Sequence, residues 1–151
     1  MTASSDPRLD LLHTWLDSLQ NRYALRLESL RPASSDASFR RYFRIDTNTV
    51  PLIIMDAPPQ YEDCGPFIHI AEKLRTVGLN TPKILEQNSS DGFLLLSDLG
   101  EQTYYQRLQT EISEAELNRI YRDALSALVT MQKADASDLP VYDRQRLSDE
   151  L

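Results

Sequence analysis

The chain has 151 residues, of which 41% are hydrophobic and 26% charged, as in a globular protein of about one domain. The net charge of −7 argues against a nucleic-acid partner, because binding a polyanion requires a basic face. The single cysteine and the lack of a signal sequence lead us to expect a cytoplasmic protein. No apolar run approaches the roughly 20 residues that cross a bilayer, so we expect it to be soluble and without a membrane partner.

The first third of the sequence predicts a helix followed by an antiparallel meander. Pro7 suits the first turn of a helix capped by Asp6 or Ser5, and leucines recur behind it at helical spacing. Alternating residues around Leu25 predict a strand, which we expect Pro32 to break. Two further strands are expected at 39–45 and 52–55.

The rest of the sequence predicts a crossing helix, two short strands and then helices. The crossing helix is expected over 65–77, between a cap at Asp63 and a stop at Gly78. Short strands are expected at 83–85 and 93–96. Ser113 opens an S-E-A-E capping box before a helix with an apolar stripe.

This order of elements predicts an α+β fold: an antiparallel sheet of about five strands with a crossing helix, then the first helices of a second unit. We expect the boundary between residues 1–99 and 100–151. The charged tail 142–151 is expected to enter a further helix, so we interpret the chain as a fragment. The apolar stripe on the helix after Ser113 would then be exposed.

Standard catalytic and metal-binding signatures are missing. Four glycines are too few for a dinucleotide fingerprint or a Walker loop. His13 and His69 fall inside predicted helices, outside any metal-ligand spacing, so we interpret both as structural or surface residues. Cys64 begins a helix, where the dipole stabilises a thiolate, but with no histidine nearby an inert thiol is favoured. We expect no catalytic residue and no metal ligand in this chain.

Three arginines lie within five residues: Arg40, Arg41 and Arg44. Guanidinium groups suit phosphate oxygens, and backbone N–H groups of the small residues at 34–38 can cradle a phosphate. The alternative is a solvated hairpin in which the arginines pair with acidic neighbours, for which the candidates are Asp36, Asp46 and Glu28. Both interpretations stay open on local chemistry.

Asp98 follows an apolar strand at the point where the chain gives way to helix. Chain that leaves a buried strand exposes backbone donors and acceptors, which can bind the edge of a flat heterocycle. The alternative is that Ser97 or Asp98 caps the next helix.

In chain order, these segments resemble the N-terminal lobe of aminoglycoside phosphotransferase-like kinases. More narrowly, they resemble bacterial anomeric kinases for N-acetylmuramate and N-acetylglucosamine in cell-wall recycling. The matching tracts are S-D-A-S-F-R-R-Y-F-R (35–44), I-M-D-A-P-P (54–59), E-D-C-G-P-F (62–67), G-L-N-T-P (78–82) and G-F-L-L-L-S-D-L-G (92–100). Each tract is modest alone, but together they are colinear over most of the chain.

The resemblance implies a protein-kinase-like N-lobe over 1–99 that binds ATP, and the start of a helical C-lobe over 100–151. The loop over the ATP phosphates would be Ser35, Asp36, Ala37, Ser38 and Phe39, followed by Arg40 and Arg41. The hinge that meets adenine would be Leu96, Ser97, Asp98 and Leu99, with Ile54 lining the adenine pocket. The ligands of Mg²⁺ would lie outside this chain.

Two departures from the family pattern concern the third strand and the catalytic loop. Kinase-like lobes usually carry a basic residue on the third strand, paired with a glutamate on the following helix. Here the strand ending at Asp56 has no basic residue, and Phe67 stands near the position of that glutamate. An aspartate that faced the phosphates would repel them, so we expect Asp56 to face away or to have a partner. Arg40 or Arg41 would supply the missing charge. Neither histidine fits a His-x-Asp catalytic core, so the catalytic base and sugar pocket would lie beyond Leu151.

Two functions therefore stay open. The first is the ATP-binding part of a kinase that phosphorylates an amino sugar at the anomeric hydroxyl, not catalytic by itself and partnered by the missing C-lobe. The second is a non-catalytic module that binds a nucleotide or a protein. An unrelated α+β domain is a third possibility.

Overall fold

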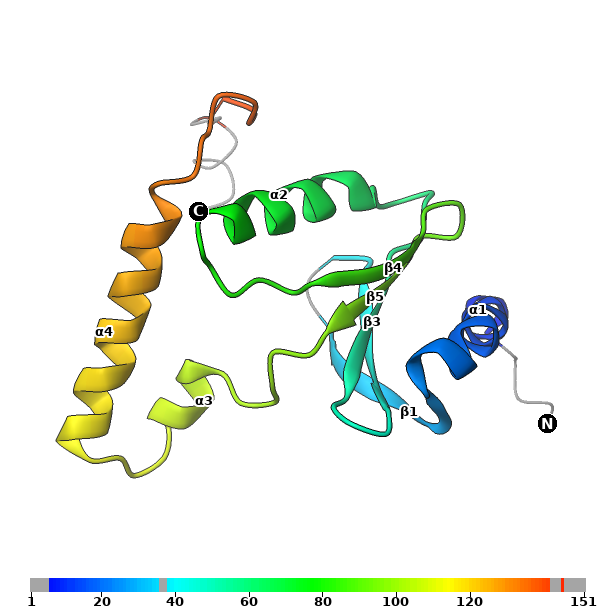
Figure 1. The fold of residues 1–151 in the computed structure, drawn as a ribbon, viewed down its shortest axis with the longest axis horizontal. Helices are drawn as coiled ribbons and strands as arrows, with labels where there is room; N and C mark the ends of the chain where they lie inside the picture. Colours follow the sequence, from blue (N-terminus) through cyan, green and yellow to red (C-terminus); the bar gives the residue numbers. More distant parts are fainter. Residues whose placement is uncertain (1–5, 36–37, 142–144, 146–151) are drawn as a thin grey trace.

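A computed structural model describes residues 6–35, 38–141 and 145, and in it five strands form one antiparallel sheet (Figure 1). The strand order is β1-β2-β3-β5-β4. The elements are α1 (Pro7–Tyr23), β1 (Arg26–Ser35), β2 (Arg41–Asp46), β3 (Leu52–Asp56), α2 (Cys64–Thr76), β4 (Ile84–Asn88), β5 (Phe93–Ser97), α3 (Tyr104–Leu108) and α4 (Glu114–Met131). The predicted α+β class and five-stranded sheet are confirmed.

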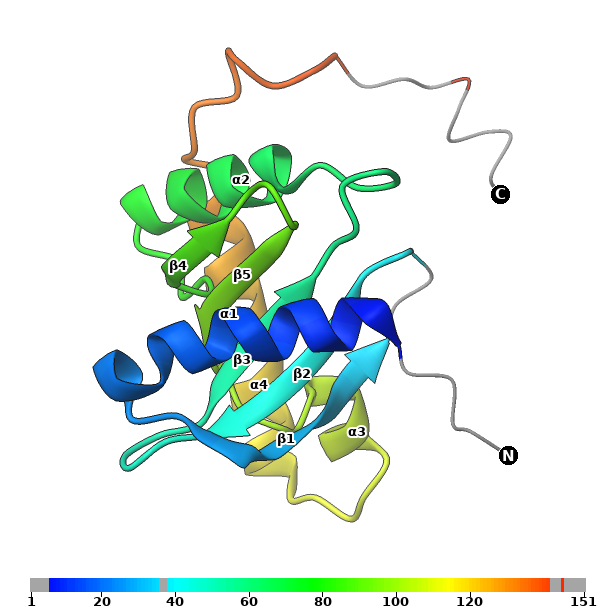
Figure 2. The ribbon, with the colours of Figure 1, turned by 90° about the vertical axis from the view of Figure 1, so that its right-hand side faces the viewer.

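Helix α1 lies across one face of the sheet, while α4 lies behind it (Figure 2). The predicted cap is confirmed, since the Asp6 carboxylate accepts a hydrogen bond from the Arg8 N–H at 3.0 Å. Leu12 and Leu16 are fully buried on the sheet-facing side of the helix. They join one core cluster with strand residues that include Phe43, Ile45, Ile54, Phe93 and Leu95.

Helix α2 packs on the opposite face of the sheet. Its residues Phe67 and Ile68 contact a second core cluster that contains Met55, Leu94 and Leu96. The Asp63 carboxylate caps the helix by accepting from the Gly65 N–H at 2.8 Å, as the sequence predicts. The two faces of the sheet are therefore covered by different helices. Because successive side chains of a strand point to opposite faces, alternate residues pack against α1 or against α2.

The prediction that Pro32 breaks the first strand is wrong. Strand β1 continues through Pro32 to Ser35, with shifts of register between Arg26 and Arg31 and between Pro32 and Ser34. This strand is at the edge of the sheet, where a proline without an N–H and an irregular register are tolerated.

The capping box predicted at Ser113 forms only in part. The Ser113 hydroxyl accepts from the Glu116 N–H at 3.2 Å, but the Glu116 carboxylate binds Arg107 instead, with Nε to Oε1 at 2.8 Å. The complete capping box is at the start of α3, where Thr103 and Gln106 satisfy each other's backbone N–H groups. Nothing in the sequence analysis anticipated that second box.

Helix α4 buries only Ile120 among its residues. Its exposed apolar side chains are Leu117, Tyr121, Leu125, Leu128, Val129 and Met131. The expected exposure of this stripe is confirmed. The further helix expected in the tail falls at 142–144 and 146–151, outside the described residues. Among the helices that the structure describes, none is long and apolar enough to cross a membrane.

A fully buried carboxylate, Asp56, stands at the end of the central strand β3. Its Oδ1 accepts from Arg8 Nε at 2.9 Å, and its Oδ2 accepts from Arg41 Nε and Nη2 at 2.9 and 2.6 Å. Arg8 also donates to the Asp91 carbonyl at 2.7 Å. This confirms the expectation that Asp56 has a partner, and it ties α1 to the middle of the sheet.

We predict that Asp56→Ala destabilises the fold by roughly 3 kcal/mol, because breaking a buried ion pair leaves two arginines without their shared partner. The estimate is at the low end of the usual range since the Arg8 and Arg41 side chains retain 21% and 38% of their solvent exposure. Urea unfolding measures the change. Asp17→Ala, an exposed position on α1, is the control and should change stability by less than about 0.5 kcal/mol. Equal effects of both substitutions would contradict the prediction.

Candidate functional site

A cavity of about 360 Å³ opens between the sheet, α2 and the chain that follows β5. Apolar side chains from three elements form its walls: Ile53 from β3, Leu96 from β5 and Phe67 from α2. The remaining lining residues are Ala33, Ser34, Tyr42, Arg44, Pro82, Ser97, Asp98, Leu99, Gly100, Glu101, Thr103 and Gln106. A slot with apolar walls and polar groups at its rim suits a flat heterocycle.

The segment 97–101, which we call the connector, is held in place by Arg44 of β2. The Asp98 carboxylate accepts from Arg44 Nε at 2.6 Å and Nη2 at 3.1 Å, and from the Gly100 N–H at 2.8 Å. Arg44 also donates to Glu101 at 3.0 Å and to the Gly100 carbonyl at 3.1 Å. The Arg44 and Asp98 side chains are only 11% and 8% exposed, so this pair fixes the connector against the sheet.

These contacts show that Asp98 is not the cap of the next helix. The hydrogen bonds from Arg44 hold the pKa of the Asp98 carboxyl below its usual range. Its oxygens are committed to Arg44 and to the connector backbone, and α3 is capped by Thr103 instead. Asp98 therefore shapes the connector rather than capping a helix.

Leu99 is a connector residue whose backbone is available. It lines the cavity, its side chain is exposed, and it makes no hydrogen bond with any described residue. Its N–H and C=O are thus a donor and an acceptor close together beside an apolar slot. Such a pair can bind the edge of an adenine-like ring.

Ile54 and Arg41 were expected at the nucleotide, and the structure places both on the other face of the sheet. Ile54 is fully buried in the core under α1, whereas its neighbour Ile53 lines the cavity. Arg41 binds Asp56 and Asp6 on the α1 side. The correction follows from the period of two in a strand, because adjacent residues point to opposite faces.

Ala33 and Ser34 of β1, which precede the predicted phosphate loop at 35–39, line the cavity. Ser35 ends that strand, and Asp36 and Ala37 lie outside the described residues. Ser38 and Phe39 follow, and the Phe39 ring is exposed and stacks on Tyr61 with centroids 4.5 Å apart. Neither Ser38 nor Phe39 lines the cavity itself.

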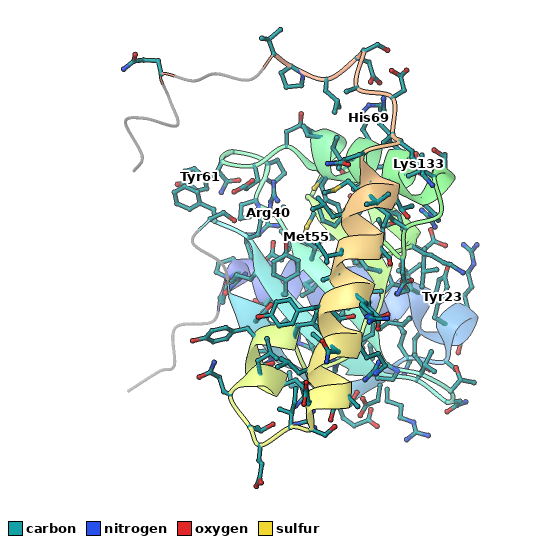
Figure 3. The ribbon with its side chains drawn as sticks, turned by 90° about the vertical axis from the view of Figure 1, so that its left-hand side faces the viewer. Tyr23, Arg40, Met55, Tyr61, His69 and Lys133 are labelled. Atoms are coloured by element: carbon teal, nitrogen blue, oxygen red, sulfur yellow. The ribbon has the colours of Figure 1, made fainter. Side chains whose placement is uncertain are left out.

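Arg40 lies between this loop and the turn that precedes α2. Its Nε donates to Glu62 Oε2 at 3.0 Å, its Nη2 lies 3.0 Å from the same oxygen, and it also interacts with the hydroxyl of Tyr42, a lining residue of the cavity. Figure 3 shows Arg40 near Tyr61, on the side of the sheet that carries Met55. Arg40 is thus the arginine of the pair Arg40/Arg41 that faces the cavity side.

All three arginines of the tract pair with carboxylates, as the hairpin interpretation supposed, but none forms an ion pair with Asp46 or Glu28, and Asp36 lies outside the described residues. The partners come from distant segments: Glu62 for Arg40, Asp56 and Asp6 for Arg41, and Asp98 and Glu101 for Arg44. Asp46 pairs with Arg31 instead. These choices depend on sheet pairing, which local sequence does not reveal.

The residues that sequence reasoning missed include Ile53, Tyr42 and Phe67. Alternation along β2 already put Tyr42 on the same face as Arg40 and Arg44. In the antiparallel pairing of β2 with β3, Arg44 lies opposite Ile53, so the two share a face. Knowledge of that register would have selected Ile53 over Ile54.

The histidines and the cysteine lie away from the cavity. His13 is exposed, and His69 contacts Asp138 at 2.8 Å. Cys64 is buried, and this burial raises the pKa of its thiol, which supports the interpretation of an inert residue. Within the described residues, no cluster of three His, Cys, Asp or Glu side chains could hold a metal ion.

We predict that Asp98→Asn lowers the stability by about 2 kcal/mol at neutral pH, because Arg44 loses a charged hydrogen-bond partner. A carboxyl with a lowered folded-state pKa stabilises the fold above the unfolded value near 3.9, and the contribution is lost as the pH falls through the folded pKa. The difference between wild type and variant should therefore shrink below about pH 4. Denaturant unfolding as a function of pH measures it.

The matched control is Asp46→Asn, which removes an exposed ion pair with Arg31. Its effect should stay below about 0.5 kcal/mol because solvent screens such pairs. A difference for Asp98→Asn that is constant between neutral pH and pH 2 would contradict the role of its charge.

Comparison with known proteins shows the family to which this chain is related. A model of the phosphotransferase enzyme family matches residues 29–151. The chain is 44% identical to an N-acetylmuramate/N-acetylglucosamine kinase of Pseudomonas aeruginosa, over 98% of the chain and 45% of that relative. It is 39% identical to a protein of the same name in Pseudomonas putida, over 91% of the chain and 42% of the relative.

A third relative with the same name, from Neisseria meningitidis serogroup B, is 32% identical over 93% of the chain and 41% of its own length. The chain thus spans less than half the length of each of these relatives. The matches agree with the resemblance seen in the sequence, and with an N-lobe of the protein-kinase-like type.

Proposed function

The chain belongs to the phosphotransferase enzyme family, and from that premise we propose that it is the ATP-binding lobe of an amino-sugar kinase. The observation that carries the proposal is the cavity bounded by the connector. There the backbone of Leu99, which no described residue hydrogen-bonds, lies beside the apolar side chains of Ile53 and Leu96. In this proposal residues 1–99 form the nucleotide lobe and 100–151 begin the second lobe. The names of the relatives support an amino sugar as acceptor.

Each side of the cavity has a distinct task in this proposal. The backbone of Leu99 binds the adenine edge, and the apolar walls hold the ring plane. Arg44 and Asp98 keep the connector at a fixed distance from the sheet. The loop before β2 and Arg40 bind phosphate oxygens, for which a guanidinium supplies directed charge-assisted hydrogen bonds.

ATP supplies the phosphoryl group. The bond from the γ-phosphorus to its bridging oxygen breaks, a bond to the anomeric oxygen of the sugar forms, and the sugar hydroxyl releases its proton to a base. The residues described here provide nucleotide binding and orientation, which are large parts of phosphoryl-transfer catalysis. Neither a base nor a Mg²⁺ site is assigned to them, since no suitable carboxylate cluster occurs among the described residues.

We predict that Arg40→Ala weakens ATP binding about tenfold, the loss expected from removing one charged hydrogen-bonding group. Arg41→Ala should leave the ATP affinity of the folded protein unchanged and lower its stability, because Arg41 binds Asp56 and Asp6 on the α1 side. Calorimetric titration of ATP and thermal unfolding separate the two effects. An equal loss of affinity in both variants would contradict the assignment.

The proposed reaction is tested with the product of the complete reading frame. Incubation with ATP, Mg²⁺ and either N-acetylmuramate or N-acetylglucosamine should yield ADP and a sugar 1-phosphate, detected by ³¹P NMR. A sugar whose anomeric hydroxyl is methylated is the control and should remain unphosphorylated. ATP binding without any sugar phosphate would instead support a non-catalytic nucleotide-binding module, an alternative that the absence of a basic residue on β3 favours.

A further inference from the structure

The three arginines of the tract are held to different extents. Arg41 and Arg44 each donate from all three guanidinium nitrogens, to acceptors on the α1 face and at the connector respectively. Among the described residues, Arg40 has one carboxylate partner, Glu62, which accepts a hydrogen bond from Nε and lies 3.0 Å from Nη2, and it also interacts with the Tyr42 hydroxyl. A guanidinium has five N–H donors, so these two partners leave others for an oxyanion.

Glu62 engages two consecutive residues through its two oxygens. Oε2 accepts from Arg40 Nε at 3.0 Å and lies 3.0 Å from Nη2, and Oε1 accepts from the Phe39 backbone N–H at 3.3 Å. The Glu62 and Arg40 side chains are 13% and 26% exposed, so solvent screens this contact less than a surface pair. One carboxylate therefore fixes both the guanidinium and the backbone at the start of β2.

A second contact reinforces the same junction. Phe39 and Tyr61 stack with an interplanar angle of 19°, which joins the chain before β2 to the turn before α2. Glu62 lies one residue before Asp63, the cap of α2. Through Glu62, the orientation of the Arg40 side chain is thus fixed relative to the start of α2.

We propose that Glu62 is the positioning residue for Arg40, holding the guanidinium at the orientation in which it receives a nucleotide phosphate. This inference rests on the proposed function, in which Arg40 binds ATP. Glu62 does not touch the nucleotide. It removes the rotamer entropy of a long side chain before the ligand arrives, so that the remaining donors are directed in advance.

The test is calorimetric titration of ATP and of adenosine into the full chain and its variants. Glu62→Gln keeps the size of the side chain and removes the charge; it should weaken ATP binding five- to tenfold and leave adenosine binding unchanged. Glu62→Asp keeps the charge but shortens the reach, and should weaken ATP binding about threefold. A general loss of structure would lower the affinity for both ligands, whereas a positioning role affects ATP alone.

The control is Glu86→Gln, which breaks a more exposed carboxylate–arginine pair with Arg22, and alters an acceptor of the Tyr23 hydroxyl, away from the cavity. It should leave both affinities unchanged. In the background of Arg40→Ala, the change Glu62→Gln should have no further effect on ATP, since the group that it positions is gone.

The outcomes separate this inference from the proposed function. Wild-type protein that binds neither ATP nor adenosine overturns both. Wild-type protein that binds ATP, with Glu62→Gln and Glu62→Asp binding it equally well, overturns the role of Glu62 alone. Tighter ATP binding by Glu62→Gln also overturns it, because the carboxylate would then compete with phosphate for the same donors.

Discussion

The buried carboxylate of Asp56 is the constraint from which the arrangement of this sheet follows. A charge without solvent must be neutralised, and here Arg8 from α1 and Arg41 from β2 supply the neutralising charges. This pairing commits Arg41 to the α1 face. Because strand residues alternate, Tyr42 and Arg44 are then directed to the opposite face, where the cavity lies.

Strand β2 is linked by its arginines to three separate parts of the chain. Arg41 joins it to α1, Arg44 to the connector after β5, and Arg40 to the turn before α2. Each pair bridges segments far apart in sequence, so each contributes to tertiary structure rather than to a local turn. The partners of Arg44, Asp98 and Glu101, line the cavity together with Arg44 itself, so this part of the rim is set by charge pairing as well as by apolar packing.

Helix boundaries and the order of the elements along the chain were largely accessible from the sequence. The cap at Asp6, the cap at Asp63 and the serine at the start of α4 were all predicted, because a cap depends on a few neighbouring residues. The hinge predicted at residues 96–99 overlaps the connector, and all four of its residues line the cavity. The phosphate loop predicted at 35–39 stays a prediction, since Asp36 and Ala37 fall outside the described residues.

The sequence by itself determined the elements, the α+β class and the family, because periodicity, capping residues and colinear motifs are properties of neighbouring residues. Only the tertiary structure decided that Ile53 rather than Ile54 lines the cavity, and that Arg41 turns away from it. Those choices depend on which strands pair and in which register. A shift of the pairing by one residue would move every side chain of the strand to the other face of the sheet. Long-range contacts such as those of Asp56 favour the register that is observed.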